Sequence, residues 1–458
     1  MRVVGMNNAL LVDLYELTMA QSYLVYKKEA CATFDLFIRQ LPRNRAYLVF
    51  CGLEDVLHYI KNLRFSKEDL SYLKSTGMFS QEFLTYLRRF RFRGDIWGMR
   101  EGEIFFANEP VLRVTASILE AQIIESFLLN TVNLQTMIAS KASRVVVAAR
   151  ERSVYDFSLR RTHGQDAGIK VARSSYIAGF SGTSCVLAGK LYGVPIVGTM
   201  AHSFVMSFKQ EIDSFLAYAH VFPERTILLV DTYETEIGIA NAIAVGLRLK
   251  ERGYRLQGIR LDSPDIASLS RKARRALDRA GLKGVKIFAS GNLDEFKIKE
   301  LLDRGSCIDS FGVGTCMGTS EDAPSLDVIY KISEVKDGSQ DFLPTMKLSK
   351  GKVTYPGRKQ VYRILDTQGR FVKDILGLEK EKIKGEKLLI KMVKQGRVIY
   401  RNPSLDKIRA YAAGRLSRVP WQLQQVYVRR TYPVRISRSL KRLRATLERQ
   451  IKKRQSFG

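Results

Sequence analysis

The sequence has few cysteines and lacks a long apolar run. Its five cysteines are odd in number, scattered and without the spacing of metal ligands, and we interpret them as reduced core thiols. No apolar stretch approaches the roughly 20 residues of a membrane span. Asp13 and Glu16 interrupt the segment in which a signal peptide would need its apolar part. The sequence therefore predicts a soluble, cytoplasmic protein with no membrane partner.

Acidic residues are also scarce, and the formal net charge is +29. Residues 401–458 contain sixteen lysines and arginines but only two acidic residues, Asp406 and Glu448. Apolar residues at helical spacing within 436–451 predict a final helix with one apolar stripe and a basic remainder. The charge suits a docked, solvated helix, attraction of anionic substrates, or nucleic-acid binding. Because no RNP sequence or zinc finger accompanies it, nucleic acid is the less favoured partner.

No proline-rich or Gly/Ser linker divides the chain, whose length allows two or three domains. Periodicity predicts an α+β domain over residues 1–125 and an α/β barrel over residues 126–330. Residues 331–458 are expected to form short strands and the basic final helix, and to pack on the other two regions. In the first region a helix is expected over 10–26, a half-buried strand over 33–39 and a long buried helix over 117–139.

Five short apolar runs, each as long as a buried strand, end in polar clusters. The runs are Val194-Pro-Ile-Val197, Thr226-Ile-Leu-Leu-Val230, residues 256–261, Val285-Lys-Ile-Phe-Ala289 and Ile308-Asp-Ser-Phe311. The clusters are Gly198-Thr-Met-Ala-His202, Asp231-Thr-Tyr-Glu234, Asp262-Ser-Pro-Asp265, Ser290-Gly-Asn292 and Gly312-Val-Gly-Thr315. Helical patterning between most runs gives a repeat typical of βα units, so a parallel barrel is predicted. Because barrel active sites lie at the carboxyl ends of the strands, the clusters should converge.

Two of these clusters have the composition of phosphate-binding loops. Ser290-Gly-Asn292 and Gly312-Val-Gly-Thr315 place small residues directly after strands, and the first precedes a helix expected to begin near Leu293. Glycine lets backbone N–H groups approach an anion, and a helix N-terminus adds a favourable dipole. Either glycine segment alone also fits an ordinary turn. Their presence in successive βα units favours phosphate binding.

Charged residues occur beside these segments. Arg260 and Asp262 lie on the same side of a strand at its end, where a guanidinium can hold a carboxylate or phosphate. The carboxylate can bind sugar hydroxyls or hydrated Mg²⁺, but the two can also form an ion pair at the barrel rim. Arg160 and Arg161 follow the strand-like residues 154–157, where they fit either an anion site or a solvated loop.

His202 is one of only four histidines. It follows a predicted strand and precedes Ser203, so its imidazole could act as a base, ligand or nucleophile. A structural histidine is the alternative. The residues alone leave both interpretations open.

Five motifs together resemble the nicotinate phosphoribosyltransferase family. They are Asp13-Leu-Tyr-Glu-Leu-Thr-Met-Ala-Gln21, Asp156-Phe-Ser-Leu-Arg-Arg-Thr-His-Gly164, Gly198-Thr-Met-Ala-His-Ser203, Gly258-Ile-Arg-Leu-Asp-Ser263 and Phe311-Gly-Val-Gly-Thr315. Residues 348–352 and Tyr432-Pro-Val-Arg-Ile-Ser437 extend the match in order and spacing over nearly the whole chain. The resemblance implies an irregular, TIM-like α/β barrel of the type II phosphoribosyltransferase kind, with an α+β domain formed mainly by the N-terminal region.

The resemblance also implies a reaction in NAD biosynthesis. The phosphoribosyl group of 5-phosphoribosyl-1-pyrophosphate would pass to nicotinate, giving nicotinate mononucleotide and pyrophosphate. ATP hydrolysis would be coupled through a phosphorylated histidine, matched here by His202, in an enzyme of the ligase and glycosyltransferase classes. Mg²⁺ would be the cofactor, and Asp262 would bind it.

Roles for individual residues follow from the same resemblance. Arg260 and Asp262 would join His202 as catalytic residues, and Tyr15 would stack on the pyridine ring from the partner subunit of a homodimer with shared active sites. The other substrate-binding residues would be Arg160, Arg161, Thr199, Ser203, Ser290, Gly291, Asn292, Gly312, Gly314 and Thr315. Of these, the two glycine segments would bind the ribose 5-phosphate, whereas Arg160 or Arg161 and Thr199, with Arg260, would hold the nicotinate carboxylate and neighbouring phosphates.

One departure and two alternatives accompany the resemblance. Pro264 stands where the family usually has glycine; it removes an N–H but suits the first turn of a helix, so activity should be retained. Relatives that use nicotinamide carry an aspartate where Ser184 stands, and a serine there does not repel a carboxylate, which favours nicotinate. A non-catalytic nucleic-acid-binding relative is the second alternative, motivated by the +29 charge.

Overall fold

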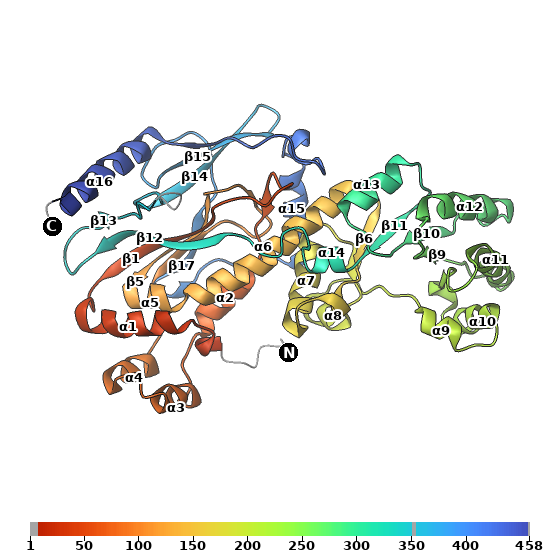
Figure 1. Cartoon of the computed structure of the whole chain (residues 1–458), viewed down its shortest axis with the longest axis horizontal. Coiled ribbons are helices and arrows are strands. Elements are labelled where there is room, and N and C mark those ends of the chain that lie inside the picture. Colours follow the sequence, from red (N-terminus) through yellow and green to blue (C-terminus); the bar gives the residue numbers. More distant parts are fainter. Residues whose placement is uncertain (1–7, 350–353, 457–458) are drawn as a thin grey trace. The chain divides into compact units, whose positions relative to one another are not determined.

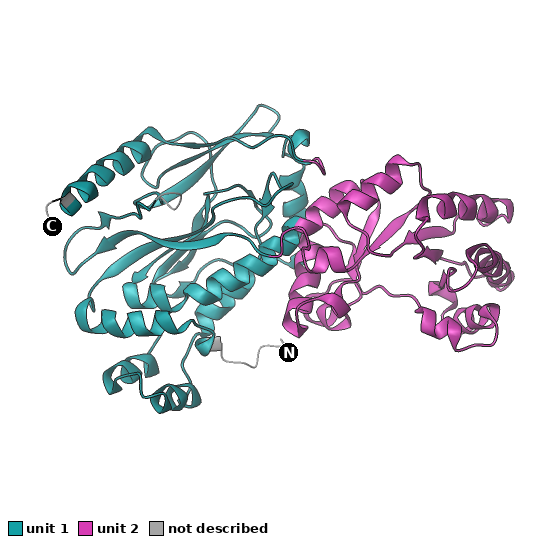
Figure 2. Cartoon of the chain, viewed as in Figure 1, with its two compact units in different colours: residues 1–140, 325–424, 428–458 teal, residues 141–324, 425–427 magenta. Residues whose placement is uncertain are grey.

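The computed structural model describes residues 8–349 and 354–456. The chain forms two compact units (Figure 2). Unit 1 contains residues 1–140, 325–424 and 428–458, and unit 2 contains residues 141–324 and 425–427. Most of the C-terminal region thus packs with the N-terminal region, and only residues 425–427 join unit 2. Part of the motif at 348–352 lies outside the described residues.

Unit 1 is built on a seven-stranded sheet in which all pairs are antiparallel. Its order is β13 (Leu343–Pro344), β12 (Val328–Lys336), β1 (Cys31–Ile38), β5 (Pro110–Ser117), β3 (Asp95–Gly98), β17 (Ile390–Lys394) and β18 (Arg397–Val398). Strand β1 is buried on both faces, not on one as predicted. The reason is that Asp35, on the polar face, forms a buried ion pair with Lys359 of β14 (Lys359–Leu365) at 2.7 Å.

A smaller sheet, a two-stranded pair and several helices complete unit 1 (Figure 1 and Figure 2). The sheet has the order β16 (Glu386–Lys387), β14, β15 (Phe371–Leu378) and β19 (Val434–Ile436), and β2 (Leu48–Val49) pairs with β4 (Ile104–Phe105). The helices are α1 (Leu14–Tyr26), α2 (Leu53–Asn62), α3 (Lys67–Ser75), α4 (Gln81–Arg88), α5 (Ile118–Ile123), the first part of α6 (Glu125–Ala148), α15 (Leu405–Leu416) and α16 (Arg438–Ser456), with 3₁₀ turns at Asn8–Leu10 and Trp421–Leu423. The single helix expected over 117–139 is therefore two helices, α5 and α6, separated at Ile124.

Helix α16 confirms the predicted final helix. Leu440 is buried and α16 packs against β15, whereas Arg438, Lys441 and Arg442 are exposed. The apolar stripe thus docks the helix, and its cations face solvent. No helix among the described residues has the length and apolarity needed to cross a membrane.

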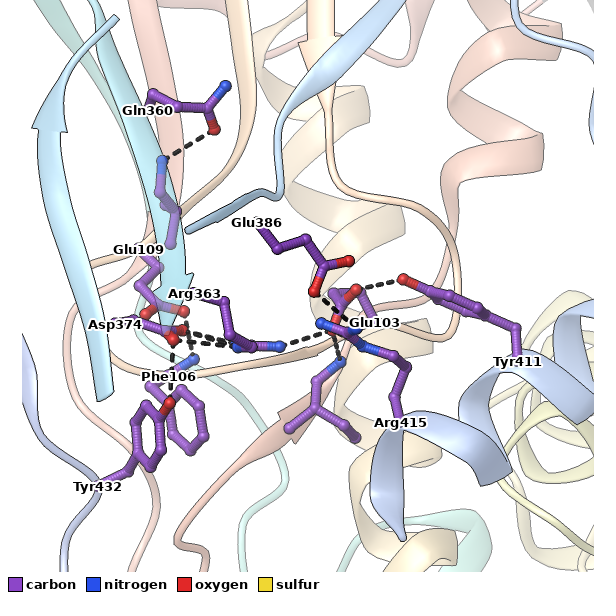
Figure 3. Close-up of polar contacts among 12 residues, drawn as sticks. Glu103, Phe106, Glu109, Gln360, Arg363, Asp374, Glu386, Tyr411, Arg415 and Tyr432 are labelled. Atoms are coloured by element: carbon purple, nitrogen blue, oxygen red, sulfur yellow. Dashed lines mark hydrogen bonds and ion pairs between the residues drawn. The ribbon is translucent and has the colours of Figure 1, made fainter. Parts of the chain in front are cut away.

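A buried ionic cluster joins distant segments of unit 1 (Figure 3). Arg363 of β14 donates to Asp374 of β15 at 2.6 and 3.0 Å and to Glu103 at 2.7 Å. Glu103 also accepts from Arg415 of α15 at 2.7 Å, and Tyr432 donates to Asp374 at 2.9 Å. These contacts attach β14, β15, α15 and the segment before β19 to the N-terminal part of the chain.

Unit 2 contains a six-stranded sheet in which all pairs are parallel. Its order is β7 (Gly182–Thr183), β6 (Ser153–Asp156), β11 (Ser310–Val313), β10 (Lys286–Ala289), β9 (Gly258–Leu261) and β8 (Ile227–Leu229). The helices after the end of α6 are α7 (Gln165–Ile177), α8 (Val186–Tyr192), α9 (His202–Met206), α10 (Glu211–Val221), α11 (Thr235–Glu251), α12 (Ile266–Arg279), α13 (Glu295–Asp303) and α14 (Thr315–Gly318), with 3₁₀ turns η2 (Leu159–Arg161) and η3 (Pro223–Arg225). The predicted mixed α/β class with a parallel sheet is confirmed, and the strand order of this sheet has two ends, β7 and β8.

Four of the five predicted runs form strands β8 to β11. The prediction for residues 194–197 is wrong, because this segment makes only an isolated parallel bridge between Thr183 and Ile196. Pro195 accepts a hydrogen bond from Thr183 N at 2.9 Å but has no N–H to donate to a ladder. Ile196 is 58% exposed, so no second neighbour covers the segment within unit 2.

Candidate active site

Arg260 connects three loops at the carboxyl edge of the parallel sheet. Its guanidinium donates to Asp262 Oδ2 at 2.7 Å, to Ser290 Oγ at 2.8 Å, and to Thr199 Oγ1 and the Met200 carbonyl, both at 3.3 Å. Asp262 follows β9, Ser290 follows β10 and Thr199 precedes α9. The structure thus brings together four of the residues singled out from the sequence.

Asp231 supports this group, a role that was not predicted from the sequence. Its Oδ2 accepts hydrogen bonds from the backbone N–H of Asp262 and from Ser263 Oγ, the latter at 2.7 Å. Its Oδ1 is buried and has no hydrogen-bond partner. The position of Asp231 at the start of the polar cluster after β8 could have identified it from the sequence. Pro264 precedes Asp265, the residue that caps α12, so it lies outside the first helical turn.

His202 is the first residue of α9 and is partly exposed. Its Nδ1 lies 3.1 Å from Oγ1 of Thr232, which follows β8, and this hydrogen bond fixes the orientation of the ring. Ser203 is exposed on the same helix. The imidazole is therefore held at the sheet edge that also carries Asp231 and Arg260, with access to solvent.

The loop at 290–292 has a backbone that favours glycine. Gly291 has φ of 103°, and a Cβ there would lie 2.6 Å from Asp262 Oδ1. Asn292 also has a positive φ, of 45°. The helix begins at Glu295 instead of near Leu293, and the Asp294 side chain caps it by accepting from Lys297 N at 2.8 Å. Residues 293 and 294 thus separate the loop from the start of α13, and within the loop Ser290 N already donates to the Leu261 carbonyl at 2.9 Å.

The second glycine segment, residues 312–315, starts in the last two residues of β11 and ends at the first residue of α14. A Cβ on Gly312 would come within 2.8 Å of the rings of Phe157 and Phe288, which stack with centroids 5.5 Å apart. Packing therefore accounts for Gly312 whether or not it contacts phosphate. A Cβ on Gly314 would lie 3.3 Å from the Phe157 carbonyl oxygen, and Thr315 begins α14.

Arg160 and Arg161 lie in η2, and both are exposed. The preceding chain is held by the buried Asp156, which accepts from Ser158 N at 2.9 Å and from Thr183 Oγ1 at 2.7 Å. Burial raises the pKa of Asp156. Since β6 is parallel to β11, both arginines follow the same edge of the sheet as the glycine segments.

Tyr15 lies on α1 in unit 1 and is 47% exposed. Beside it, Ser126 Oγ lies 2.6 Å from Asp13 Oδ2 and 2.7 Å from Glu16 Oε1. One hydroxyl proton cannot serve both carboxylates, but a protonated Glu16 can donate to Ser126. Burial, assisted by the charges of Glu125 and Asp13, raises the pKa of Glu16 to about 8. Glu16 is therefore mainly neutral at pH 7.

The shifted Glu16 predicts a pH-dependent stability. The folded protein keeps this proton up to about pH 8, whereas the unfolded chain releases it near its ordinary pKa of 4.5. Stability from this group is therefore complete below pH 4.5 and is lost as the pH rises toward 8. Because glutamine does not titrate, Glu16→Gln should remove this loss, which is roughly 3 kcal/mol between pH 5 and 8. Urea unfolding of both proteins across this range measures it, and parallel stability curves would contradict the assignment.

The parallel α/β sheet, with an arginine, a carboxylate and a glycine loop at its carboxyl edge, fits the type II phosphoribosyltransferase fold that the resemblance implied. Three family descriptions match the chain in order: the nicotinate phosphoribosyltransferase N-terminal domain at residues 10–133, the family itself at 152–340 and its C-terminal domain at 382–444. The chain belongs to the nicotinate phosphoribosyltransferase family, as the resemblance predicted.

Individual relatives agree with this assignment. The chain is 46% identical to nicotinate phosphoribosyltransferase pncB2 of Mycobacterium tuberculosis, covering 94% of this chain and 91% of that protein. It is 37% identical to the nicotinate phosphoribosyltransferase of Bacillus subtilis, with 93% and 92% covered. The crystal structure of human nicotinic acid phosphoribosyltransferase matches with a TM-score of 0.84 at 29% identity, covering 95% of this chain and 99% of that one.

Proposed function

We propose that the protein transfers the phosphoribosyl group of 5-phosphoribosyl-1-pyrophosphate to nicotinate, as a step in NAD biosynthesis. The pyridine nitrogen forms a bond to the anomeric carbon, and the C–O bond to pyrophosphate breaks with its electron pair leaving on the pyrophosphate. The observation that carries the proposal is the convergence of Asp262, Ser290 and Thr199 on Arg260, in a chain that belongs to this family.

All substrates of this reaction are anionic, and the geometry supports the reaction because it places the cationic Arg260 at the centre of the site. Bond breaking develops positive charge on the ribose and negative charge on the pyrophosphate, so the site needs fixed cationic donors more than a strong base. Arg260, held by three loops, is such a donor, and we assign it to the nicotinate carboxylate and neighbouring phosphates together with Thr199 and Arg160 or Arg161. Ser203 is proposed as a further substrate contact.

The remaining assignments use the loops described above. We propose that residues 290–292 and 312–315 bind the ribose 5-phosphate, and that Asp262 binds the ribose. Tyr15 is proposed to stack on the pyridine ring from the second copy of a homodimer with shared active sites. Its exposed ring supports that role.

Mg²⁺ fits the residues at the sheet edge. Asp262 and the unpartnered Oδ1 of Asp231 are oxygen donors, and the described residues contain no cluster of three acidic, histidine or cysteine ligands. Mg²⁺ commonly binds one or two carboxylates and shares substrate phosphates and water. Bound there, the ion would neutralise charge on the leaving pyrophosphate. Arg260 and Asp231 would meanwhile hold Asp262 in place.

We further propose that His202 couples transfer to ATP hydrolysis by accepting the ATP γ-phosphate. The imidazole attacks phosphorus, ADP leaves, and water later releases the phosphate. The partial exposure of His202 and its hydrogen bond to Thr232 support a nucleophile that is accessible and oriented.

The coupling predicts the behaviour of His202→Ala. ATP hydrolysis should fall by at least about 10²-fold, while slow uncoupled transfer continues, because the groups around Arg260 remain. Phosphate release and nicotinate mononucleotide formation are measured in parallel. His220→Ala removes an exposed histidine of α10 in the same unit and serves as the matched control. A wild-type protein that forms no phosphohistidine with labelled ATP would remove this role.

One experiment tests the proposed function directly. Nicotinate mononucleotide and pyrophosphate are measured with nicotinate or nicotinamide as acceptor, with and without ATP. A higher kcat/KM for nicotinamide would overturn the choice of base, which depends on Ser184. Tight, salt-sensitive RNA binding without any pyrophosphate release would instead support a non-catalytic nucleic-acid-binding protein, the alternative suggested by exposed cations such as those of α16.

A further inference from the structure

A buried ion network lies behind the two glycine loops of unit 2. Lys141 Nζ, on α6, lies 2.7 Å from Glu295 Oε2 and 2.8 Å from Asp322 Oδ1. Arg144 Nε, one turn further along, donates to Glu295 Oε1 at 3.0 Å. The side chains of Lys141, Arg144 and Glu295 are at most 5% exposed, and that of Asp322 is 24% exposed.

The two carboxylates that Lys141 joins have a particular place in the chain. Glu295 begins α13, three residues after Asn292 in the first glycine loop. Asp322 follows α14, the short helix that begins at Thr315 in the second loop. A single ammonium group therefore connects the elements that directly follow both loops.

The network is balanced in charge, with two cations facing two carboxylates. Further contacts hold Arg144 in place: it donates to the Val426 carbonyl at 2.8 Å and lies over the Phe296 ring. A buried charge that loses its partner is strongly disfavoured, so the four groups cannot separate at low cost. Movement of α13 relative to α14 would have to break a contact of Lys141.

We propose that Lys141 is a positioning residue that sets the spacing of the two phosphate loops, and thereby the affinity for the 5-phosphate of phosphoribosyl pyrophosphate, without contacting it. This inference rests on the proposed function, because that function assigns both loops to one phosphate. Loops that share a ligand need a fixed separation, and supporting ion pairs commonly provide it.

The test measures phosphoribosyl pyrophosphate binding by calorimetry in the absence of nicotinate. Lys141→Met removes the ammonium group but keeps an apolar side chain of similar length. The Kd of this variant for phosphoribosyl pyrophosphate should rise about tenfold. Asp303→Asn is the matched control, because Asp303 ends α13 and pairs with Arg150 just after α6 at an exposed position, at 2.5 Å. The control should stay within about twofold of wild type. The KM for nicotinate should change little in either variant.

An unchanged Kd in folded Lys141→Met overturns the inference, and so does an equal rise in Asp303→Asn, which would indicate a general loosening of α13. If Lys141→Met does not fold, Asp322→Asn takes its place. Asp322→Asn leaves the ion pair between Lys141 and Glu295 intact, so it should raise the Kd for phosphoribosyl pyrophosphate by less than Lys141→Met would. A wild-type protein that binds phosphoribosyl pyrophosphate but forms no nicotinate mononucleotide refutes the proposed function alone. Absence of binding overturns both.

Discussion

Replacing Arg260 with alanine is expected to lower kcat/KM for nicotinate by about 10³-fold. The substitution removes donors from the point where loops after β9 and β10 and before α9 meet. It also leaves Asp262 without its ion-pair partner at 2.7 Å, which adds a negative charge where anionic substrates bind. Steady-state kinetics with both substrates varied measure the loss.

Two further variants make the Arg260 experiment specific. Arg260→Lys keeps the charge but cannot reproduce the planar fork, so a loss of roughly 10²-fold is expected. Arg255→Ala removes an exposed arginine just before the opposite end of the same strand, and its kinetics should match wild type. Activity of Arg260→Ala within threefold of wild type would show that the site lies elsewhere.

The largest effect on stability is expected from Arg363→Met, which should destabilise unit 1 by about 3–5 kcal/mol. The change leaves Asp374 buried without its arginine partner and removes one of the two arginines that pair with Glu103. Burial and the nearby Asp374 already raise the pKa of Glu109, so the cluster has little capacity for a second unpaired carboxylate.

The measurement can be confined to the unit concerned. Both tryptophans, Trp97 and Trp421, belong to unit 1, so their fluorescence reports its unfolding in urea. Arg370→Gln is the control, since its ion pair with Asp366 at 2.9 Å is exposed and its loss should leave the urea midpoint nearly unchanged. Equal midpoints for Arg363→Met and wild type would show that the cluster does not hold unit 1 together.

The sequence predicted the strands best where apolar runs end in polar residues. Runs ending before Asp231, Asp262, Ser290 and Gly312 form β8 to β11. Strands β9, β10 and β11 each lie between two neighbours in the parallel sheet, and β8 is the edge strand beside β9. The prediction for the fifth run, residues 194–197, was wrong because of Pro195. The apolar composition of this run suggested a strand, but Pro195 has no backbone N–H to donate to a neighbouring strand. The break at Ile124 between α5 and α6 was missed because no proline or glycine marks it.

The site was predictable only at the level of strand ends. Parallel strands bring their carboxyl ends to one edge, which is why Arg260 and Ser290 meet as expected. The contacts between His202 and Thr232, and between Asp231 and Asp262, depend on side-chain rotamers and loop paths that periodicity does not encode. The grouping of residues 425–427 with unit 2 likewise depends on tertiary packing.

The ionic cluster around Arg363 limits how this chain can be recombined with its relatives. Glu103 is contributed by the first quarter of the polypeptide, whereas its two arginine partners come from the last quarter. A chimera that takes its C-terminal quarter from another family member would place that relative's residues, instead of the two arginines of this chain, opposite the native Glu103. Such hybrids should fold only when both halves of the cluster are exchanged together, so the two ends of the polypeptide are expected to evolve as a pair.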